Sequence, residues 1–240
     1  MVLEAPERMK LPVPVGRDAQ WRVVIRPARF ETERIASLAE CERLLAGSAV
    51  RLRGWDFPTV DERTLRRGAD WIAGSVELGT IVEYWKFFQS GQFIHLSAFE
   101  ENGDPRYSPE NLRGRYRVPE HFHPTGAIDY LSIIYATTEI FEFASRLAVR
   151  GVLGDDLVVE VEMVGIDGRL LTSLSRWMTG FYPATAPVLG RWWATETPAL
   201  IARSAIMAVD AAMWFYERFR WTDVSREGIE REQQLLLERR

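Results

Sequence analysis

The sequence predicts an α+β fold, in which an antiparallel sheet carries helices on one or both faces and the chain forms a single domain. Residues 71–99 are rich in aromatic and β-branched residues, and glycines stand where the chain would reverse, as in adjacent antiparallel strands. Other segments repeat their apolar residues at helical spacing. The resulting order, strand, helix, strands, helix, hairpin, helix and helix, is typical of the α+β class.

The N-terminal part predicts an arm, a strand and a helix. Residues 1–20 hold three prolines and a glycine among charges, and we expect a flexible arm there. A first strand follows over residues 21–26 and ends at Pro27. Ser37 and Glu40 form a capping box, which predicts a helix that ends at Gly47.

The central prediction is a set of three adjacent strands over residues 71–78, 81–88 and 92–99. In the middle strand Trp85 and Phe87 share one face, whereas Tyr84 and Phe88 share the other. Because both faces carry large aromatic side chains, we expect both faces to be covered.

The second half of the chain predicts one hairpin among three helices. Residues 100–124 read as a long polar loop, and a helix is expected from 126 to 150. An Asp-Gly turn predicts a hairpin between residues 157–164 and 170–171. Thr197 and Pro198 begin a further helix that runs to about residue 219, after an aromatic loop over 175–196. We therefore assign residues 21–225 to one α+β domain and residues 226–240 to a charged C-terminal helix.

Composition is that of a soluble globular protein, with 47% apolar and 27% charged residues. The single cysteine, Cys41, excludes an internal disulfide and fits the cytoplasm. The most apolar helix, over residues 198–216, is interrupted by Arg203 and Asp210, so we expect no membrane span. No glycine-rich phosphate loop is present, and we expect no cofactor.

Four segments carry a resemblance to a known family. They are Arg-Gly-Trp-Asp-Phe-Pro at 53–58, Glu-Tyr-Trp-Lys-Phe-Phe-Gln-Ser-Gly-Gln-Phe at 83–93, Thr-Glu-Ile-Phe-Glu-Phe-Ala at 138–144 and Trp-Phe-Tyr-Glu-Arg-Phe-Arg-Trp at 214–221. On these segments the chain resembles an uncharacterised bacterial family, a module sometimes attached to a Schlafen-type DNA-binding domain. The resemblance covers most of residues 21–225. It implies a role near nucleic acid and carries over no catalytic residue.

Large aromatic residues predict an interaction surface in the second half of the chain. Tryptophan, tyrosine and arginine dominate interface hot spots, and burial in a core is not automatic for a loop. The alternative is that these rings cap the core. The candidate interface residues are Trp177, Phe181, Tyr182, Trp192 and Trp193.

Arginines within the 100–124 segment predict an anion-binding site. If this segment is extended, Arg113, Arg115 and Arg117 lie on one side with Tyr116 between them, and they could hold a phosphate chain or an acidic partner. A solvated loop is the alternative.

A histidine pair is the candidate metal site. His121 and His123 would point the same way on an extended segment and could share a divalent ion. The chain offers few further ligands, so a plain loop is the alternative. The acid and base in Glu83 and Lys86 are three residues apart, which puts them on opposite faces of a strand and argues against a nuclease pair.

These patterns lead to three hypotheses about function. The first is a non-enzymatic interaction module, accessory or regulatory, that docks on a partner protein or associates with itself. The second is recognition of nucleic acid or a nucleotide through the arginine-rich loop. The third is a metal-dependent hydrolase or nuclease that uses His121 and His123.

Overall fold

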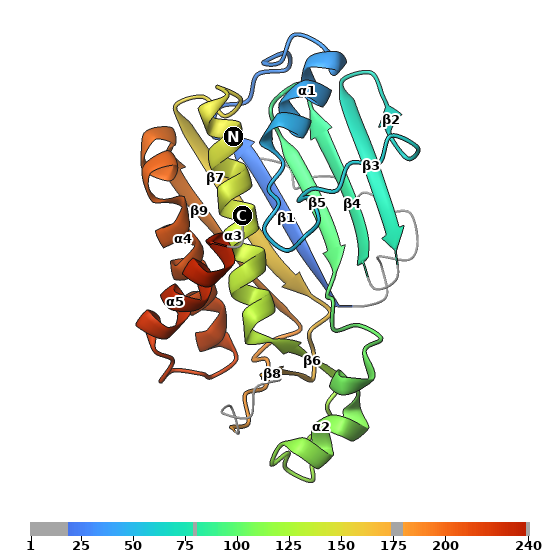
Figure 1. Ribbon diagram of the computed structural model, residues 1–240, viewed down its shortest axis with the longest axis vertical. Helices are drawn as coiled ribbons and strands as arrows, with labels where there is room; N and C mark the ends of the chain where they lie inside the picture. Colours follow the sequence, from blue (N-terminus) through green and yellow to red (C-terminus); the bar gives the residue numbers. More distant parts are fainter. Residues whose placement is uncertain (1–18, 79–80, 174–179, 239–240) are drawn as a thin grey trace, which may run out of the picture.

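The sheet predicted by the sequence is present and is larger than expected (Figure 1). The computed structural model describes residues 19–78, 81–173 and 180–238 of the chain. Seven strands form one sheet in the order β2-β3-β4-β5-β1-β7-β9, and every neighbouring pair is antiparallel. Their bounds are β1 Gln20–Pro27, β2 Arg66–Arg67, β3 Trp71–Leu78, β4 Ile81–Phe88, β5 Phe93–Ala98, β7 Asp156–Val164 and β9 Val188–Glu196.

Four longer helices accompany the sheet, which confirms the α+β class. They are α1 Leu38–Ser48, α3 Tyr130–Val149, α4 Thr197–Arg218 and α5 Arg226–Leu237. In Figure 1 all four lie in front of the sheet. Ser37 caps α1 as the capping box predicts, since its hydroxyl accepts a hydrogen bond from the backbone N–H of Glu40.

One hydrophobic core holds the helices to the sheet. It runs from Ala19 to Leu236 and includes Trp85, Phe141 and Phe215, each fully buried. The C-terminal helix α5 is part of it through Ile229 and Leu236, because its charged residues occupy only its outer side. Cys41 is buried in α1, and burial raises the pKa of its thiol to about 11.

The two faces of the sheet differ, and the expectation that both are covered is wrong for the described residues. On β1, Trp21, Val23 and Ile25 are buried beneath the helices, whereas Arg22 on the other face is exposed. We call the helix-facing side the covered face and the other side the open face. On β4 the open face holds Tyr84, Lys86 and Phe88, which are partly exposed. Figure 1 places no helix of the described chain behind it.

The hairpin predicted from the Asp-Gly turn is wrong. β7 pairs with β1 and β9, whereas β8 Arg169–Thr172 pairs in parallel with β6 Gly126–Asp129 in a separate two-stranded sheet. The Asp-Gly turn is compatible with a hairpin, but β8 has only four residues. Pairing with the longer strands β1 and β9 hydrogen-bonds β7 along its whole length. The second strand partner, β9, occupies part of the segment that we expected to be an aromatic loop.

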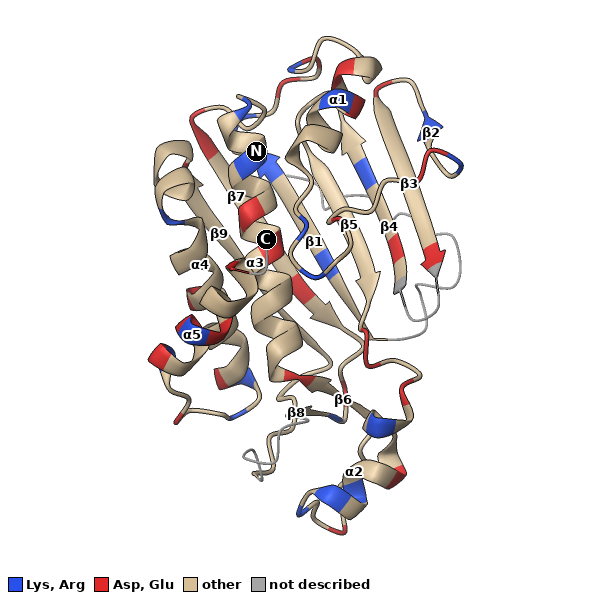
Figure 2. Ribbon diagram, in the orientation of Figure 1, with Lys and Arg blue, Asp and Glu red and all other residues tan. Residues whose placement is uncertain are grey.

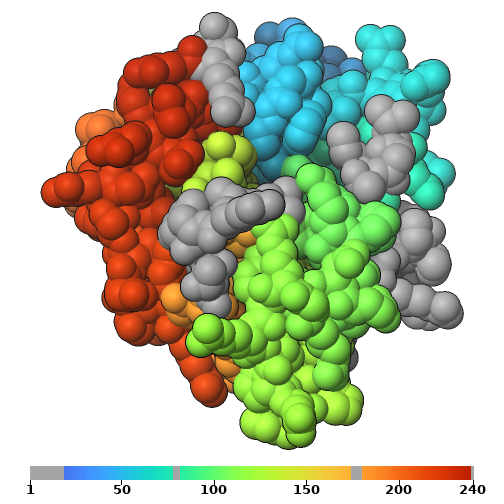
Figure 3. All heavy atoms as spheres, turned by 60° about the horizontal axis from the view of Figure 1, so that its bottom comes forward, coloured from blue at the N-terminus to red at the C-terminus, as the bar shows by residue number. Residues whose placement is uncertain are grey.

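The segment between β5 and β6 forms one end of the molecule (Figure 3). It contains a short 3₁₀ turn, η1 Pro105–Tyr107, and the helix α2 Pro109–Arg115. A small cluster of apolar side chains anchors it, formed by Tyr107, Leu112, Tyr116, Ala127 and Leu170. The expected polar loop is therefore partly helical. The expected arm over residues 1–20 lies outside the described residues except for its last two positions.

Candidate functional site

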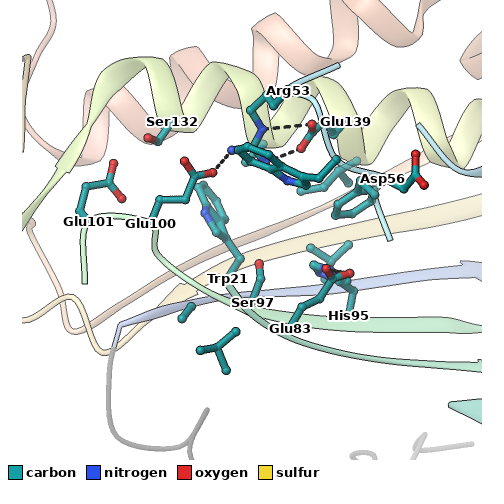
Figure 4. Close-up of a pocket in the computed structure, with 17 residues that line it drawn as sticks. Trp21, Arg53, Asp56, Glu83, His95, Ser97, Glu100, Glu101, Ser132 and Glu139 are labelled. Atoms are coloured by element: carbon teal, nitrogen blue, oxygen red, sulfur yellow. Dashed lines mark hydrogen bonds and ion pairs between the residues drawn. The ribbon is translucent and has the colours of Figure 1, made fainter. Parts of the chain in front are cut away.

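The covered face contains a cavity in which polar side chains from distant parts of the chain converge (Figure 4). Its walls come from the loop between α1 and β2, from β4 and β5, and from the first half of α3. The polar lining residues are Arg53, Asp56, Glu83, His95, Ser97, Glu100, Glu101, Ser132 and Glu139. Three of the four segments that carry the family resemblance meet here, at Arg53, Glu83 and Glu139.

An ion-pair network crosses the cavity at Arg53. Its Nε donates to Oε1 of Glu139 at 3.0 Å, and its two terminal nitrogens contact Oε2 of Glu139 and Oε1 of Glu100. Glu139 is fully buried on α3. Burial alone would lower the pKa of Arg53, but the charges of Glu139 and Glu100 raise it, so the guanidinium stays charged. The network fastens the 53–58 loop to α3.

A buried Glu–His pair lies on neighbouring strands at the other end of the cavity. Nε2 of His95 is 2.9 Å from Oε1 of Glu83, and the same oxygen accepts a hydrogen bond from the backbone N–H of Thr59. The carbonyl of Thr59 accepts a hydrogen bond from the indole of Trp85. Glu83 thus lies on the covered face, whereas the ammonium of Lys86 lies over the ring of Trp71 on the open face. The expectation that Glu83 and Lys86 lie on opposite faces of their strand is confirmed. His95 is held in one orientation, with its second ring nitrogen free of partners.

Glu101 is a buried carboxyl group of the cavity with a raised pKa. One of its oxygens accepts a hydrogen bond from the backbone N–H of Asp129, the residue that caps α3. Burial raises the pKa of Glu101 to about 7, an effect that Ser132 and the Asp129 amide only partly offset. Protonated and charged forms therefore coexist at neutral pH. A cation placed beside this group would favour the charged form.

Chemically, the cavity is suited to binding through hydrogen bonds and charge. Among the residues that the structure describes, no three histidine, cysteine or acidic side chains are placed to hold a metal ion. The arrangement therefore offers acceptor atoms and negative charge to a ligand.

A second candidate lies at the edge of the sheet, where β9 meets α4. We call it the β9–α4 surface and define it by Trp192 on the open face of β9 and by Ile201 and Ile206 of α4 on the helix side, which are 65%, 42% and 45% exposed. Beside them, Arg191 and Trp193 of β9 and Arg203 and Met207 of α4 line a groove of about 400 Å³. In the described chain no strand pairs with the outer edge of β9.

The five predicted interface residues do not form one patch. Trp177 lies outside the described residues. Phe181 packs edge-on against Phe122 in the small apolar cluster, and Tyr182 contacts Trp221. Trp193 is directed towards the helices and packs against Phe141, whereas its neighbour Trp192 stands on the open face. Two adjacent residues of a strand point to opposite faces, which is why the rings separate.

The predicted arginine ladder does not form because its segment is helical. Arg113 and Arg115 belong to α2, where residues two apart point to nearly opposite sides. Arg113 donates to the carbonyl of Phe122, and Tyr116 is buried with its hydroxyl bonded to the carbonyl of Ser173. Arg113, Arg115 and Arg117 remain exposed, and Figure 2 shows basic residues gathered on this projecting helix. Their role in binding nucleic acid stays a prediction.

The histidine pair lies just beyond that helix and is exposed. Nδ1 of His123 is 3.4 Å from a terminal nitrogen of Arg113, a cation that disfavours a metal ion at the same place. His121 and His123 thus share no ligand set with other described residues. The described residues around His121 and His123 therefore give the hydrolase hypothesis no metal-ligand set as support.

Sequence reasoning missed most of the cavity. The available signal was Glu139, which continues the apolar stripe of α3 four residues after Tyr135 and so places a carboxylate on a buried side. A buried carboxylate needs a partner, and a distant arginine is the common one. Nothing in the spacing of Arg53, Glu83 and Glu101 could show that they meet, because their proximity depends on the order of strands.

Comparison with known proteins adds no relative: no family model, no curated protein and no solved structure matches the chain.

Proposed function

We propose that this chain is an interaction module that associates with a second copy of itself through the β9–α4 surface. The observation that carries the proposal is that one nine-residue edge strand and the adjoining helix both expose apolar side chains. Only 39% of the most apolar window of α4 is buried, although that window is apolar enough to cross a membrane. Exposed edge strands mark interaction sites, and here exposed apolar side chains stand on both sides of the edge.

The sequence of β9 is suited to pairing with its own copy. Antiparallel pairing about a two-fold axis at Trp192 would place Trp192 opposite itself and Arg191 opposite Trp193 of the second copy. Within one chain the guanidinium carbon of Arg191 already lies 5.5 Å from the Trp193 ring centre, so these groups are compatible. A two-fold interface needs such self-complementarity, since each residue must accept its counterpart in reverse.

The position of α4 supports the same arrangement. A two-fold axis perpendicular to the sheet keeps the helices of both copies on one side of the joined sheet. The exposed apolar residues Ile201 and Ile206 of α4 would then lie near the α4 helix of the second copy. One symmetry operation therefore covers both the open edge and the apolar helix side, which a partner of unrelated shape would have to match separately.

Analytical ultracentrifugation over a wide range of protein concentration tests this proposal. We expect a reversible dimer, and we expect Trp192→Lys and Ile206→Glu each to shift the protein to monomer while its circular dichroism stays unchanged. Phe30→Lys is the matched control, because Phe30 is 72% exposed and lies on the loop after β1. Hydrogen exchange should become slower in β9 as the dimer forms, since its outer amides gain partners.

Two outcomes would overturn the proposal. The first is a monomer at the highest soluble concentration. The second is a protein that is monomeric in solution and floats with lipid vesicles through α4, which would make the exposed apolar side a membrane contact.

A further inference from the structure

The cavity of the covered face contains two buried polar atoms that have no hydrogen-bond partner. They are Oε2 of Glu101 and Nδ1 of His95, on side chains that belong to residues 5% and 1% exposed. Both residues line the cavity. Leaving a buried polar atom unpaired destabilises the folded state, so native proteins almost always satisfy such atoms with protein groups, water or a ligand.

Both unpaired atoms are acceptors. The carboxylate of Glu83 accepts a hydrogen bond from the backbone of Thr59 and lies 2.9 Å from Nε2 of His95. Because a carboxylate only accepts, the proton of the neutral imidazole belongs on Nε2, which leaves a lone pair on Nδ1. The carboxylate oxygen of Glu101 is an acceptor in its charged form. A ligand that satisfies either atom must bring a donor.

The charge of the cavity selects a cation. Five carboxyl groups line it, at Asp56, Glu83, Glu100, Glu101 and Glu139, against the one guanidinium of Arg53. Arg53 is already held by Glu139 and Glu100. Of the remaining acids, Glu83 and Glu101 are buried, where attraction to a cation is stronger than at the surface. The indole of Trp21 also belongs to the lining, and the face of an indole attracts cations; the ring of Trp55 already has the guanidinium of Arg53 over it, 4.9 Å from its centre.

The size of the cavity limits what can enter. Its volume is about 50 Å³, enough for a few water molecules or one small head group, since a single water needs about 10–15 Å³. Exposed Asp56 and half-exposed Glu100 stand where solvent can reach it, and they would attract a cation to the opening. A nucleotide or a sugar is too large.

We propose that this cavity binds a small organic cation with N–H donors, an ammonium or guanidinium head group, at the unpaired Oε2 of Glu101. The head group belongs either to a free amine or to a basic side chain of a peptide. Its hydrogen-bonding chemistry is the same in both cases. This proposal is independent of the β9–α4 surface, which lies at the edge of the sheet.

Isothermal titration calorimetry with three probes tests the proposal. Methylguanidinium and ethylammonium carry charge and donors, whereas tetramethylammonium carries charge alone. We expect the first two to bind and the third to bind about tenfold more weakly or not at all, because hydrogen bonds to charged groups account for such a factor. An arginine-containing peptide used in place of methylguanidinium then shows whether a side chain or a free amine is accepted.

Glu101→Gln is the decisive variant, because it removes the charge and keeps the shape of the side chain. We expect it to weaken methylguanidinium binding about tenfold or more. Glu160→Gln is the control: Glu160 is a partly buried carboxyl on the open face of β7, outside the cavity. Equal affinities of Glu101→Gln and wild type would overturn the proposal, as would equal binding of all three probes or no binding of any.

Proton release supplies a readout on the unmodified protein. A cation that binds beside Glu101 holds this carboxyl charged, so binding near neutral pH should release a fraction of a proton. Glu83, Glu100, Glu139, Asp56 and His95 face the same cavity, and the Glu101→Gln comparison separates their contribution. Titrations in buffers of different ionisation enthalpy measure the release. Binding without proton release at pH 6.5, close to the pKa of about 7 for Glu101, would overturn the assignment of Glu101 as a ligand.

Discussion

The covered and open faces of the sheet are built from alternating residues of the same strands, and they have become different environments. On β4, Trp85 is fully buried, whereas its neighbours Tyr84 and Lys86 are half exposed. On β9, Trp193 packs against the core while Trp192 is open to solvent. The two faces are similar in residue types. What separates them is the helix layer, and the same side chain therefore has a different energetic role on each face.

The charged residues show the same contrast. On the covered face, Glu139 and Arg53 are enclosed and held by several hydrogen bonds. On the open face, Glu162 pairs with Arg22, whose side chain is half exposed. Water screens the second pair and not the first, so the two pairs should differ in their effect on folding.

Replacing a tryptophan on each face gives the largest expected difference. Trp85→Ala should lower the free energy of unfolding by about 3–5 kcal/mol, because it empties a packed site and removes the hydrogen bond to the carbonyl of Thr59. Trp192→Ala should change it by less than about 0.5 kcal/mol. Urea denaturation of both variants measures the difference. Similar losses would mean that the open face is covered in solution, and then a low protein concentration should remove the effect.

Neutralising one acid on each face comes next. Glu139→Gln removes one of the two carboxylates that pair with the buried Arg53, and it should lower the free energy of unfolding by about 3 kcal/mol. Glu162→Gln should lower it by less than about 1 kcal/mol. Chemical denaturation at pH 7 compares the two. If the double variant Arg53→Met/Glu139→Leu recovers most of the lost stability, the loss in Glu139→Gln arises from the buried Arg53 charge that no longer has Glu139 as its partner. A cost of Glu139→Gln below that of Glu162→Gln would contradict the contrast between the faces.

The pH dependence of stability sharpens the comparison further. The folded-state pKa of Glu101, about 7, lies above its ordinary value near 4.3, so the folded chain holds a proton that the unfolded chain loses. The stabilisation from this proton is complete below about pH 4.3 and is lost as the pH rises through 7, by at most about 4 kcal/mol. Wild type should therefore lose stability from pH 5 to 8 relative to Glu101→Gln. Parallel curves for the two proteins would disprove this.

The smallest effect is expected on the open face. Lys86 lies with its ammonium 4.0 Å from the ring centre of Trp71, and partial burial lowers its pKa. Lys86→Met keeps most of the aliphatic part of the side chain and removes the charge. It should lower the free energy of unfolding by about 0.5–1 kcal/mol, because the contact of the ammonium with the Trp71 ring is lost. Thermal unfolding measures this. A loss above about 2 kcal/mol would show that Lys86 has a further partner.

Alternation along strands made much of the sheet predictable from sequence. The three strands over residues 71–99, the first strand, the Ser37 cap and the start of α4 all follow local rules and are confirmed. The pairing of strands did not follow them. β7 and β8 carry a good turn between them, yet each pairs elsewhere, because partners distant in sequence bury their apolar sides better.

The cavity was less predictable than the sheet for the same reason. Arg53, Glu83 and Glu139 come from a loop, a strand and a helix, and only the strand order brings them together. The prediction for the arginines of α2 was wrong for a local reason. Their alternation suggested an extended ladder, but Ser108 and Pro109 start a helix, which overrides the period of two.

The place of β1 in the sheet has a consequence for how the chain acquires its structure during synthesis. β1 leaves the ribosome before the other described strands, yet it ends up between β5 and β7, and Arg22 lies 140 residues from its partner Glu162. One edge of β1 stays unpaired until β7 has been made, so folding is dominated by distant contacts and should be slow. A nascent chain that stalls before residue 156 would present that edge to other chains, where strands add easily. Ribosome-bound chains of increasing length should therefore become resistant to protease only after β7 emerges.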